Sequence, residues 1–236
     1  MATHLTFDID WAPDWSIIDC LEILAKSKTK ATFFCTHPTP LNVEIKRFGH
    51  NLGIHPNFLQ GTTQGGSTVE IVENLLDLAP SATCMRTHAL VQSSPLLHEI
   101  FSCFSQLRFD FSLLTPGIGL SKLIYWHFDN VEFHRINYQW EDDAFFWNKA
   151  YSWTNFMPES PHFVMDFHPI HVSLNSSSLA NYQNLKSNLN GAMSRISPKD
   201  CKKFINEKSG TRNALEYAIS EFNCISFEDL LCELAS

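Results

Sequence analysis

Two carboxylates spaced two residues apart end the first apolar run of the chain, Thr6-Phe7-Asp8-Ile9-Asp10. In a strand this spacing places Asp8 and Asp10 on one face, where two like charges repel each other unless a metal ion or a proton lies between them. The pair therefore indicates an active site. The structural alternative is that both residues cap the following helix or face water.

Polar side chains also end several later apolar runs. His55, Arg86, His88 and His168 each stand at or just after the end of such a run. Because the carboxyl ends of the strands in a parallel α/β barrel face the active site, we expect these side chains to converge. One carboxylate with two neutral imidazoles leaves positions open for water and substrate, which is typical of a catalytic zinc-like site. A single histidine is nevertheless more often a core or surface residue, and the chain has eleven.

Taken in chain order, these residues resemble the polysaccharide deacetylase family with the NodB homology domain, which is carbohydrate esterase family 4. The chain looks like a divergent member of that family over about residues 5–175. The motifs that carry the resemblance are Thr6-Phe7-Asp8-Ile9-Asp10, Ala31-Thr32-Phe33-Phe34, Gly53-Ile54-His55, Met85-Arg86-Thr87-His88, Trp140-Glu141-Asp142-Asp143 and Phe167-His168-Pro169.

One departure from the family concerns the metal site. The family normally has a second histidine four residues after the first, and this chain has Leu59 there. Since leucine cannot bind a metal, the resemblance implies Asp10, His55 and His88 as the ligands, with His88 standing where the family usually has a proline. Two alternatives remain open, which are His50 as the third ligand and a degenerate metal site.

The resemblance also implies roles in a metal-assisted hydrolysis. Asp8 would be the general base that takes a proton from water, and His168 the general acid that protonates the leaving amine or alcohol. Arg86 would hold Asp8 in place and keep it ionised, and Asp142 would orient His168 or Arg86. The plain alternatives are a purely structural ion pair for Arg86 and a solvated acidic turn for Asp142.

Three further residues are candidates for substrate contact. Most large aromatic residues belong to the core of a protein, but Trp11 and Trp140 stand beside the motifs and could stack on sugar rings. His171 follows His168 by three residues. It is expected either to contact the substrate or to support His168.

The function that follows from the resemblance is a metal-dependent hydrolase, a deacetylase that removes an N- or O-acetyl group from a carbohydrate. We expect an acetylated sugar or polysaccharide intermediate of surface-polysaccharide metabolism as substrate. The cofactor would be a divalent metal ion, zinc first, with cobalt or nickel as alternatives. Two other functions stay open: a catalytically degenerate member that binds a sugar or partner, which Leu59 favours, and a C–N hydrolase of cyclic amides or ureides.

The elements that must position these residues alternate between strand and helix over roughly the first hundred residues, which is typical of βα units around a parallel sheet. β-Branched and aromatic runs predict strands at Leu5–Asp10, Ala31–Cys35, Thr83–Arg86, Leu107–Phe111, Lys122–Phe128, Val131–Asn137 and Phe163–Phe167. Periodicity and capping signals predict helices at Trp15–Lys26, from Ser67 through Leu78, from Ser94 toward Cys103, at Thr211–Glu221 and at Phe227–Leu234. The predicted fold is α/β, a distorted (β/α) barrel of about seven strands that is similar to a TIM barrel.

The composition of the chain limits the number of domains, the kinds of partner and the compartment that we expect. With 236 residues, of which 44% are hydrophobic, the chain suits one domain over residues 1–236. A net charge of −8 argues against nucleic acid as a partner, and no apolar run approaches the roughly 20 residues of a transmembrane segment. Seven scattered cysteines and no export signal at the start favour a cytoplasmic protein with reduced thiols. The oligomeric state stays open.

Overall fold

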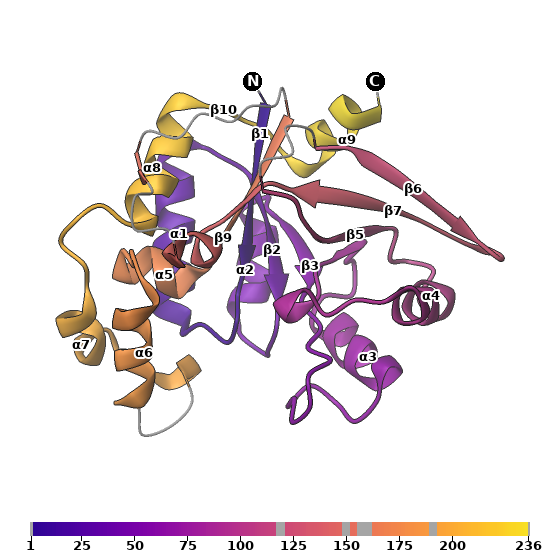
Figure 1. Ribbon diagram of the computed structural model, residues 1–236, viewed down its shortest axis with the longest axis horizontal. Coiled ribbons are helices and arrows are strands. Elements are labelled where there is room, and N and C mark those ends of the chain that lie inside the picture. Colours follow the sequence, from indigo (N-terminus) through magenta and orange to yellow (C-terminus); the bar gives the residue numbers. More distant parts are fainter. Residues whose placement is uncertain (1, 117–120, 148–151, 155–161, 189–192, 236) are drawn as a thin grey trace.

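The computed structural model describes residues 2–116, 121–147, 152–154, 162–188 and 193–235, and its centre is one β-sheet. The strands described are β1 (Ala2–Asp8), β2 (Ala31–Cys35), β3 (Asn51–Ile54), β4 (Cys84–Met85), β5 (Phe109–Leu114), β6 (Leu123–Phe128), β7 (Val131–Tyr138), β8 (Trp140–Glu141), β9 (His162–Phe167) and β10 (Asn223–Cys224). They follow the order β6-β7-β5-β4-β3-β2-β1-β9-β8 across the sheet, with β10 paired to β1 (Figure 1).

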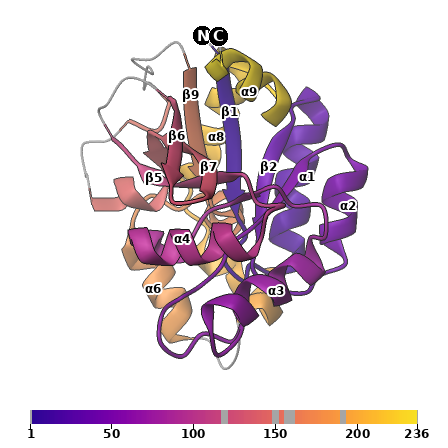
Figure 2. The same cartoon turned by 90° about the vertical axis from the view of Figure 1, so that its right-hand side faces the viewer.

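Helices surround this sheet. The α-helices described are α1 (Asp14–Ser27), α2 (Leu41–Arg47), α3 (Thr68–Leu78), α4 (Ser94–Cys103), α5 (Pro169–Leu174), α6 (Leu179–Ser187), α7 (Pro198–Cys201), α8 (Thr211–Glu221) and α9 (Phe227–Ala235), and 3₁₀ turns cover His88–Leu90, Asp143–Trp147, Met193–Arg195 and Lys202–Phe204. Helix α5 packs between α1 and α8 on one flank, and α3 packs against α4 on another (Figures 1 and 2).

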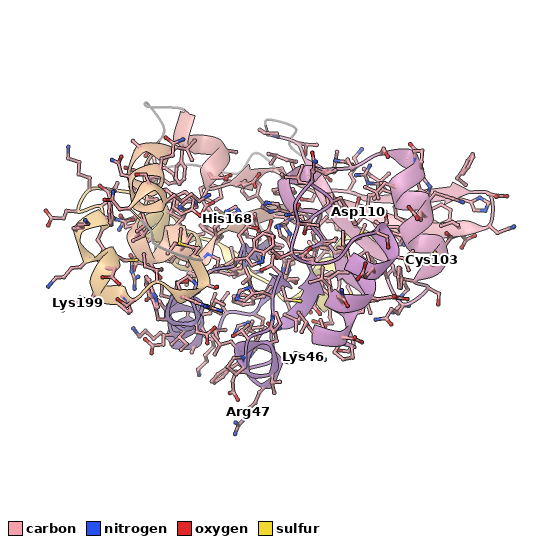
Figure 3. The ribbon with its side chains drawn as sticks, turned by 90° about the horizontal axis from the view of Figure 1, so that it is seen from below. Lys46, Arg47, Cys103, Asp110, His168 and Lys199 are labelled. Atoms are coloured by element: carbon pink, nitrogen blue, oxygen red, sulfur yellow. The ribbon has the colours of Figure 1, made fainter. Side chains whose placement is uncertain are left out.

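The sheet brings the carboxyl ends of most of its strands to one edge. Strands β1 to β5 pair with their neighbours in parallel, and among the strands described β6 is the one that runs antiparallel, against β7. All seven residues of β1 are buried, as expected for a parallel strand with both faces covered. The shared edge is the lower one in Figure 1, and Figure 3 looks onto it from below.

The described pairing does not close the sheet, because β6 and β8 lie at its two ends. One residue, Gln139, separates β7 from β8, although β7 pairs with β5 and β8 pairs with β9. A mixed α/β fold with a largely parallel sheet is therefore confirmed. The seven-strand barrel stays a prediction.

The capping signals of two helices were tested by the structure. The Oγ of Ser67 accepts the amide of Glu70 at 3.2 Å at the start of α3, as its sequence pattern predicts. At α4 the cap is Ser93 rather than the predicted Ser94, since the Oγ of Ser93 accepts the amide of Leu96 at 3.3 Å. Ser94 and the proline after it form the first turn of that helix.

The sequence patterns do not predict strand β3, because it has only four residues and one of them is glycine. A Cβ on Gly53 would lie 2.7 Å from Cδ1 of Phe34 and 2.8 Å from the carbonyl oxygen of Cys84. The two neighbouring strands thus approach too closely for any side chain at this position. Helices α2 and α5, with seven and six residues, are too short to show a helical period.

The described chain carries no helix with the length and apolar character that crossing a membrane requires. The seven cysteines are all free thiols. Packing and hydrogen bonds, rather than disulfides, therefore hold the fold together.

Candidate active site

The two aspartates of the opening motif lie at the carboxyl end of β1 but not on one strand face. Strand β1 ends at Asp8, and Asp10 and Trp11 then turn the chain with φ values of 46° and 53°. The Oγ1 of Thr36, in the loop after β2, accepts the amide of Trp11 at 3.0 Å. The predicted strand to Asp10 is therefore too long. Asp10 is placed by a left-handed turn, a conformation that residues other than glycine adopt only uncommonly.

Asp10 meets two histidines from different loops. Its Oδ1 lies 3.1 Å from Nε2 of His55 and 2.9 Å from Nδ1 of His88, and the two nitrogens are 3.3 Å apart. Around a tetrahedral zinc with bonds of about 2.1 Å, ligand atoms lie about 3.4 Å apart. This donor set therefore fits a divalent metal ion, with coordination positions left for water and substrate.

Hydrogen bonds between the loops bring the two histidines together. The amide of His55, just after β3, donates to the carbonyl of Cys35 at 2.8 Å, and the amide of His88 donates to the carbonyl of Pro56 at 2.9 Å. Leu59 is 45% exposed, whereas His88, from the loop after β4, lies against the ring of His55. That His88 replaces the second histidine of the family stays a prediction.

His50, the alternative ligand, lies at the other end of β3 from His55. Its Nδ1 accepts the amide of Ala31 at 3.2 Å, where β2 begins. Burial lowers the pKa of His50 to about 4 and so favours the neutral ring that this bond requires. The structure therefore gives His50 a structural position and leaves it outside the group formed by Asp10, His55 and His88.

Opposing effects set the charges in this group. Burial acts to raise the pKa of Asp10, but hydrogen bonds from His55 and His88 outweigh it and hold that pKa well below its ordinary value. Burial acts to lower the pKa of His88, but the hydrogen bond and charge of Asp10 outweigh it and raise that pKa. Asp10 is thus ionised and ready to act as a ligand, and a metal ion that binds here competes with the proton that the raised pKa of His88 favours.

A fully buried arginine binds Asp8. The Nη1 of Arg86 lies 2.9 Å from Oδ1 of Asp8 and also bonds Oδ1 of Asp166 on β9. Its Nη2 donates to Oγ1 of Thr6 at 2.9 Å. The predicted contact between Arg86 and Asp8 is therefore present, in a network that includes a second carboxylate.

Arg86 remains charged in spite of its burial. Burial opposes the charge, but the carboxylates of Asp166 and Asp8 outweigh it and raise the pKa of Arg86 above its ordinary value. The rings of Phe34 and Tyr138 lie 4.8 Å and 4.2 Å from the guanidinium carbon and add cation–π attraction.

Asp166 is the member of this network that the motifs did not reveal. It is completely buried, and burial raises its pKa well above the ordinary value, with partial opposition from Arg86. The sequence does carry a signal, because Asp166 is the one acidic residue in the apolar run of residues 163–167. A charge inside a buried strand requires a partner, so such a residue marks a buried network.

Asp142 orients His168. The Nδ1 of His168 lies 2.7 Å from Oδ1 of Asp142, and the amide of His168 donates to Oδ2 at 2.9 Å. Asp142 is completely buried, so it is not part of a solvated turn. Burial acts to lower the pKa of His168, but the charge and hydrogen bond of Asp142 outweigh it and raise that pKa well above 6.5. The Nε2 of His168 lies 3.7 Å from Oδ2 of Asp10 and so faces the histidine pair.

The two tryptophans predicted to contact substrate lie in different environments. Trp11 is partly exposed, and its ring centre is 5.3 Å from that of His88. Trp140 is only 2% exposed and packs on Phe167 with ring centres 4.8 Å apart. Trp11 can meet a ligand as the structure stands, whereas Trp140 is a core residue that a sugar could reach only after a rearrangement.

His171 lies behind His168. Its ring is 3% exposed, with its centre 5.5 Å from that of His168 and 4.5 Å from that of Tyr182. Burial, and then the charge of His168, lower the pKa of His171 well below its ordinary value. Of the two predicted roles, a neutral support for His168 fits this position better than contact with substrate.

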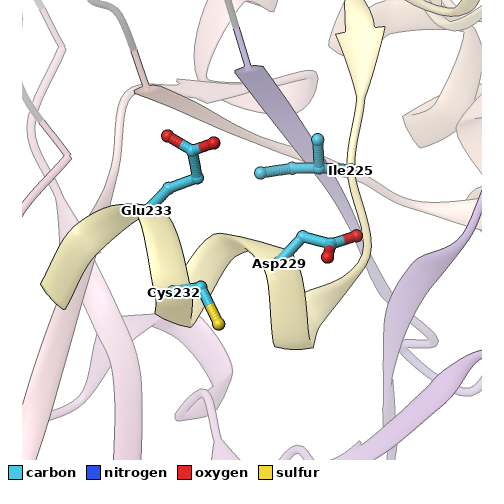
Figure 4. A pocket seen from close by; sticks show the side chains of 4 residues that line it. All are labelled: Ile225, Asp229, Cys232 and Glu233. Carbon is cyan, nitrogen blue, oxygen red and sulfur yellow. The ribbon is translucent and has the colours of Figure 1, made fainter. Parts of the chain in front are cut away.

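A surface pocket lies away from this group. Ile225, Asp229, Cys232 and Glu233 line it over helix α9 (Figure 4). The adjacent strand β10 pairs with Ala2 and Thr3 at the amino end of β1. The length of β1 therefore separates this pocket from Asp8.

Comparisons with known proteins find relatives of this chain in sequence and in structure. Residues 5–186 match the family model of the WbmS-like polysaccharide deacetylases. A crystal structure from Bordetella bronchiseptica, of a protein assigned as a polysaccharide deacetylase involved in O-antigen biosynthesis, shares 33% identity over 92% of this chain and 89% of that one, with a TM-score of 0.77. Among curated proteins, none matches the sequence.

More distant structures share the fold. A family 4 acetyl xylan esterase from Clostridium thermocellum, in complex with a cobalt ion, matches 99% of this chain and 91% of its own, with 13% identity and a TM-score of 0.51. A peptidoglycan N-acetylglucosamine deacetylase matches 97% of this chain and 87% of its own, with 16% identity and a TM-score of 0.50.

Proposed function

Because this chain belongs to the WbmS-like polysaccharide deacetylase family, whose fold is related to that of the family 4 carbohydrate esterases, we propose that it removes an acetyl group from a carbohydrate by metal-dependent hydrolysis. The observation that carries this proposal is the convergence of Asp10, His55 and His88 beside Asp8 and His168. The candidate metal ligands thus lie close to the carboxylate of Asp8 and to the imidazole of His168, all at the carboxyl ends of separate strands.

Asp10, His55 and His88 would hold the metal ion. A divalent ion supplies Lewis acidity, which polarises an acetyl carbonyl and lowers the pKa of a bound water. The carboxylate of Asp10 and the two neutral imidazoles would give the site a net charge of +1 with such an ion. That charge favours the oxyanion that develops during hydrolysis.

Asp8 would take the proton of the attacking water. Its Oδ1 is bound to Arg86, whereas its Oδ2 lies 3.6 Å from Nδ1 of His55 and faces the ligand group. Arg86 fixes the carboxylate through a charge-assisted hydrogen bond. One oxygen of Asp8 is thus held in place while the other remains available as a base.

His168 would give a proton to the leaving amine or alcohol. Its raised pKa keeps the imidazole protonated near neutral pH, and Asp142 holds Nδ1 so that Nε2 points to the ligand group. This geometry suits a general acid.

We extend the proposal to the details that the resemblance implies. Zinc is the favoured metal, since two imidazoles and a carboxylate suit it, and cobalt is the ion seen in the acetyl xylan esterase. The substrate is an acetylated sugar or polysaccharide intermediate of surface-polysaccharide assembly, in line with the role assigned to the Bordetella protein. Action in the cytoplasm is part of the same proposal.

The proposal also includes a barrel that closes at the junction of β7 and β8. The amide of Gln139 donates to the carbonyl of Val164 at 3.1 Å, and its side-chain Oε1 accepts the amide of Val164 at 3.0 Å. Gln139 thus pairs with β9 through both its backbone and its side chain. This bridge supports a ring of seven strands, with β7 and β8 counted as one interrupted strand.

Two aspartate variants test the division of roles. Asp8→Asn should abolish acetate release from acetylated sugars while the protein still binds zinc, and Asp10→Asn should weaken zinc binding itself. Acetate release over a panel of acetylated sugars and zinc titration by calorimetry measure the two effects. Full activity in Asp8→Asn would overturn the role of the base. A folded protein that binds no zinc, cobalt or nickel would indicate the degenerate, sugar-binding alternative.

The same assay separates the proposal from the remaining alternative. A panel of cyclic amides and ureides is run beside the acetylated sugars, with ring opening as the readout. Turnover of the cyclic substrates without any release of acetate would assign the site to C–N hydrolysis instead.

A further inference from the structure

The backbone next to His88 has an unfavourable conformation that contacts with other segments must stabilise. This segment follows β4, which has only two residues. The two residues after His88, Ala89 and Leu90, have φ values of 51° and 53°. Such left-handed residues persist only where the surrounding structure holds them, because each one is unfavourable by itself. The position of His88 must therefore be determined by contacts that the segment makes with its neighbours.

Ser112 bonds this segment on both sides of His88. The Oγ of Ser112 accepts the amide of Thr87 at 2.8 Å, and its carbonyl accepts Nε2 of Gln92 at 2.5 Å. Ser112 belongs to β5, where the register with β7 shifts between Asp110 and Leu113. A bulge of this kind releases a residue from the strand ladder and turns its groups elsewhere. Ser112 is thus free to bond the neighbouring loop.

A buried ion pair holds the bulge in turn. Asp110 is completely buried, and its Oδ1 accepts the amide of Ser112 at 2.9 Å. Its Oδ2 lies 2.7 Å from Nε of Arg135 on β7. Arg135 also donates through Nη2 to Oε1 of Gln92. The bonds therefore run from β7 to β5, from β5 to the His88 segment, and back to β7.

This network lies at the edge of the sheet that carries the candidate site. Asp110 and His168 are both labelled in the middle part of Figure 3, which looks onto that edge. Taking a charged pair out of water offsets most of the attraction between its members, so a buried pair adds little net stability over apolar residues. What a network of this kind does supply is a fixed geometry for the groups that it bonds.

We infer that Asp110, Ser112, Gln92 and Arg135 form a clamp that positions His88 as a metal ligand. The inference rests on the proposed function, since it concerns the same site. It explains how His88, in the loop after β4, could bind the metal when the loop after β3 has Leu59 at the position of the family's second histidine. The four residues are positioning residues, because they act on the metal through His88 and do not touch it.

Zinc affinity is the first measurement. Gln92→Ala removes two bonds of the clamp from a half-buried position, and Ser112→Ala removes the bond to Thr87. Each should raise the Kd for zinc about 10-fold, the effect usual for partners that orient a metal ligand. His88→Ala should raise it further. With cobalt bound, the visible spectrum of both clamp variants should shift as the geometry at His88 loosens.

Matched controls come from the same chain. Gln106 also bridges two carbonyls, those of Pro80 and Ala82, through its Nε2 at 3.3 Å and 3.2 Å. The buried Ser121 donates its Oγ to Gln139 at 3.0 Å. Gln106→Ala and Ser121→Ala remove bonds of the same kind away from the His88 segment. Both should bind zinc as the unchanged protein does.

Amide hydrogen exchange of residues 87–92, measured without metal, is the second readout. Exchange there should quicken in Gln92→Ala and Ser112→Ala but not in the two controls. The inference would be overturned if His88→Ala lost its affinity for zinc while Gln92→Ala and Ser112→Ala kept theirs unchanged. If the unchanged protein bound no metal, the proposed function would fail by itself. Amide exchange would then still decide whether the clamp holds residues 87–92. Exchange that is no faster in the clamp variants than in the unchanged protein would reject the clamp.

Discussion

Arg86 is one cation between two buried carboxylates, Asp8 and Asp166. A single positive charge does not neutralise both of them in a medium that solvates ions poorly. Burial raises the pKa of Asp166 well above its ordinary value, which favours a proton on this carboxyl group. The other partner of Arg86 is Asp8, the group that the proposed reaction uses as a base.

This division of charge predicts unequal effects of two substitutions. Arg86→Met leaves a buried carboxylate unpaired and should lower the free energy of unfolding by about 3–5 kcal/mol. Asp166→Asn replaces a protonated carboxyl group by a neutral group of the same shape and should lower it by less than about 1 kcal/mol. Urea unfolding at pH 7 measures both. Equal losses in the two variants would mean that Asp166 is ionised.

Single residues were predictable where a local pattern marked them. Asp8, Asp10, His55, Arg86, His88 and His168 end apolar runs, and the structure brings them together. The pairing of residues far apart in the chain was not predictable from local patterns. Thr6 and Asp166 are 160 positions apart in the chain, and only the pairing of β1 with β9 makes them neighbours.

At the level of elements, helix α3 and the loop before it support His55. The Nε2 of Gln64 donates to the carbonyl of His55 at 3.2 Å, and Asn74 on α3 donates to the carbonyl of Gln64 at 2.8 Å. The start of α3 is fixed by Ser67, whose Oγ accepts the amide of Glu70, while Oε2 of Glu70 accepts the amide of Gly66 at 2.8 Å. The cap thus sets the position of a helix that holds the ligand loop.

Loss of that cap should be measurable as stability. Ser67→Ala should lower the free energy of unfolding by about 1 kcal/mol, because it leaves an amide of the first turn without its acceptor. Ser226→Ala is the matched variant, since the Oγ of Ser226 accepts the amide of Asp229 at 3.1 Å at the start of α9. A similar loss is expected there. The role of the cap would be contradicted if urea unfolding gave Ser67→Ala the same free energy of unfolding as the unchanged protein while Ser226→Ala had a lower one.

Long elements with a clear period were the predictable ones. The helix at Thr211–Glu221 and the strand at Ala31–Cys35 have the predicted bounds, whereas β1 ends two residues before the prediction. Strands β8 and β10 have two residues each and carry no alternation to read. The strand predicted at Thr83–Arg86 is present but shorter, since β4 covers only Cys84–Met85. These short strands exist because neighbouring strands supply their hydrogen-bond partners.

For the molecule as a whole, His4 predicts how stability depends on pH. Burial lowers the pKa of His4 from 6.5 to about 4, and the ring bonds the carbonyl of Ile225 at 3.0 Å and Oγ1 of Thr32 at 2.9 Å. The unfolded chain therefore binds a proton more readily than the folded one. The contribution of His4 is complete above pH 6.5 and is lost as the pH falls from 6.5 toward 4.

The expected size of this effect is about 2 kcal/mol of unfolding free energy between pH 7 and pH 5. In His4→Gln the fall over the same interval should be smaller by that amount. Urea unfolding at the two pH values, for both proteins, gives the comparison. The same fall in His4→Gln as in the unchanged protein would assign the pH dependence to other groups.

The fold class was predictable because alternating strand and helix patterns leave few arrangements other than a parallel sheet. The predicted barrel stays a prediction, since its closure would depend on one residue, Gln139, whose side chain takes part in strand pairing. The single domain over residues 1–236 also stays a prediction.

The central position of β1 has a consequence for the order in which the chain can assemble. This strand precedes two of its neighbours, β9 and β10, by a long stretch of chain, and His4 bonds a carbonyl 221 residues further along. Native contacts of such high sequence separation slow folding, because a long loop must close before they form. We therefore expect β1 to complete its pairing only after β9 and β10 have been made. A fragment that lacks the last third of the sequence should expose β1 and aggregate rather than fold.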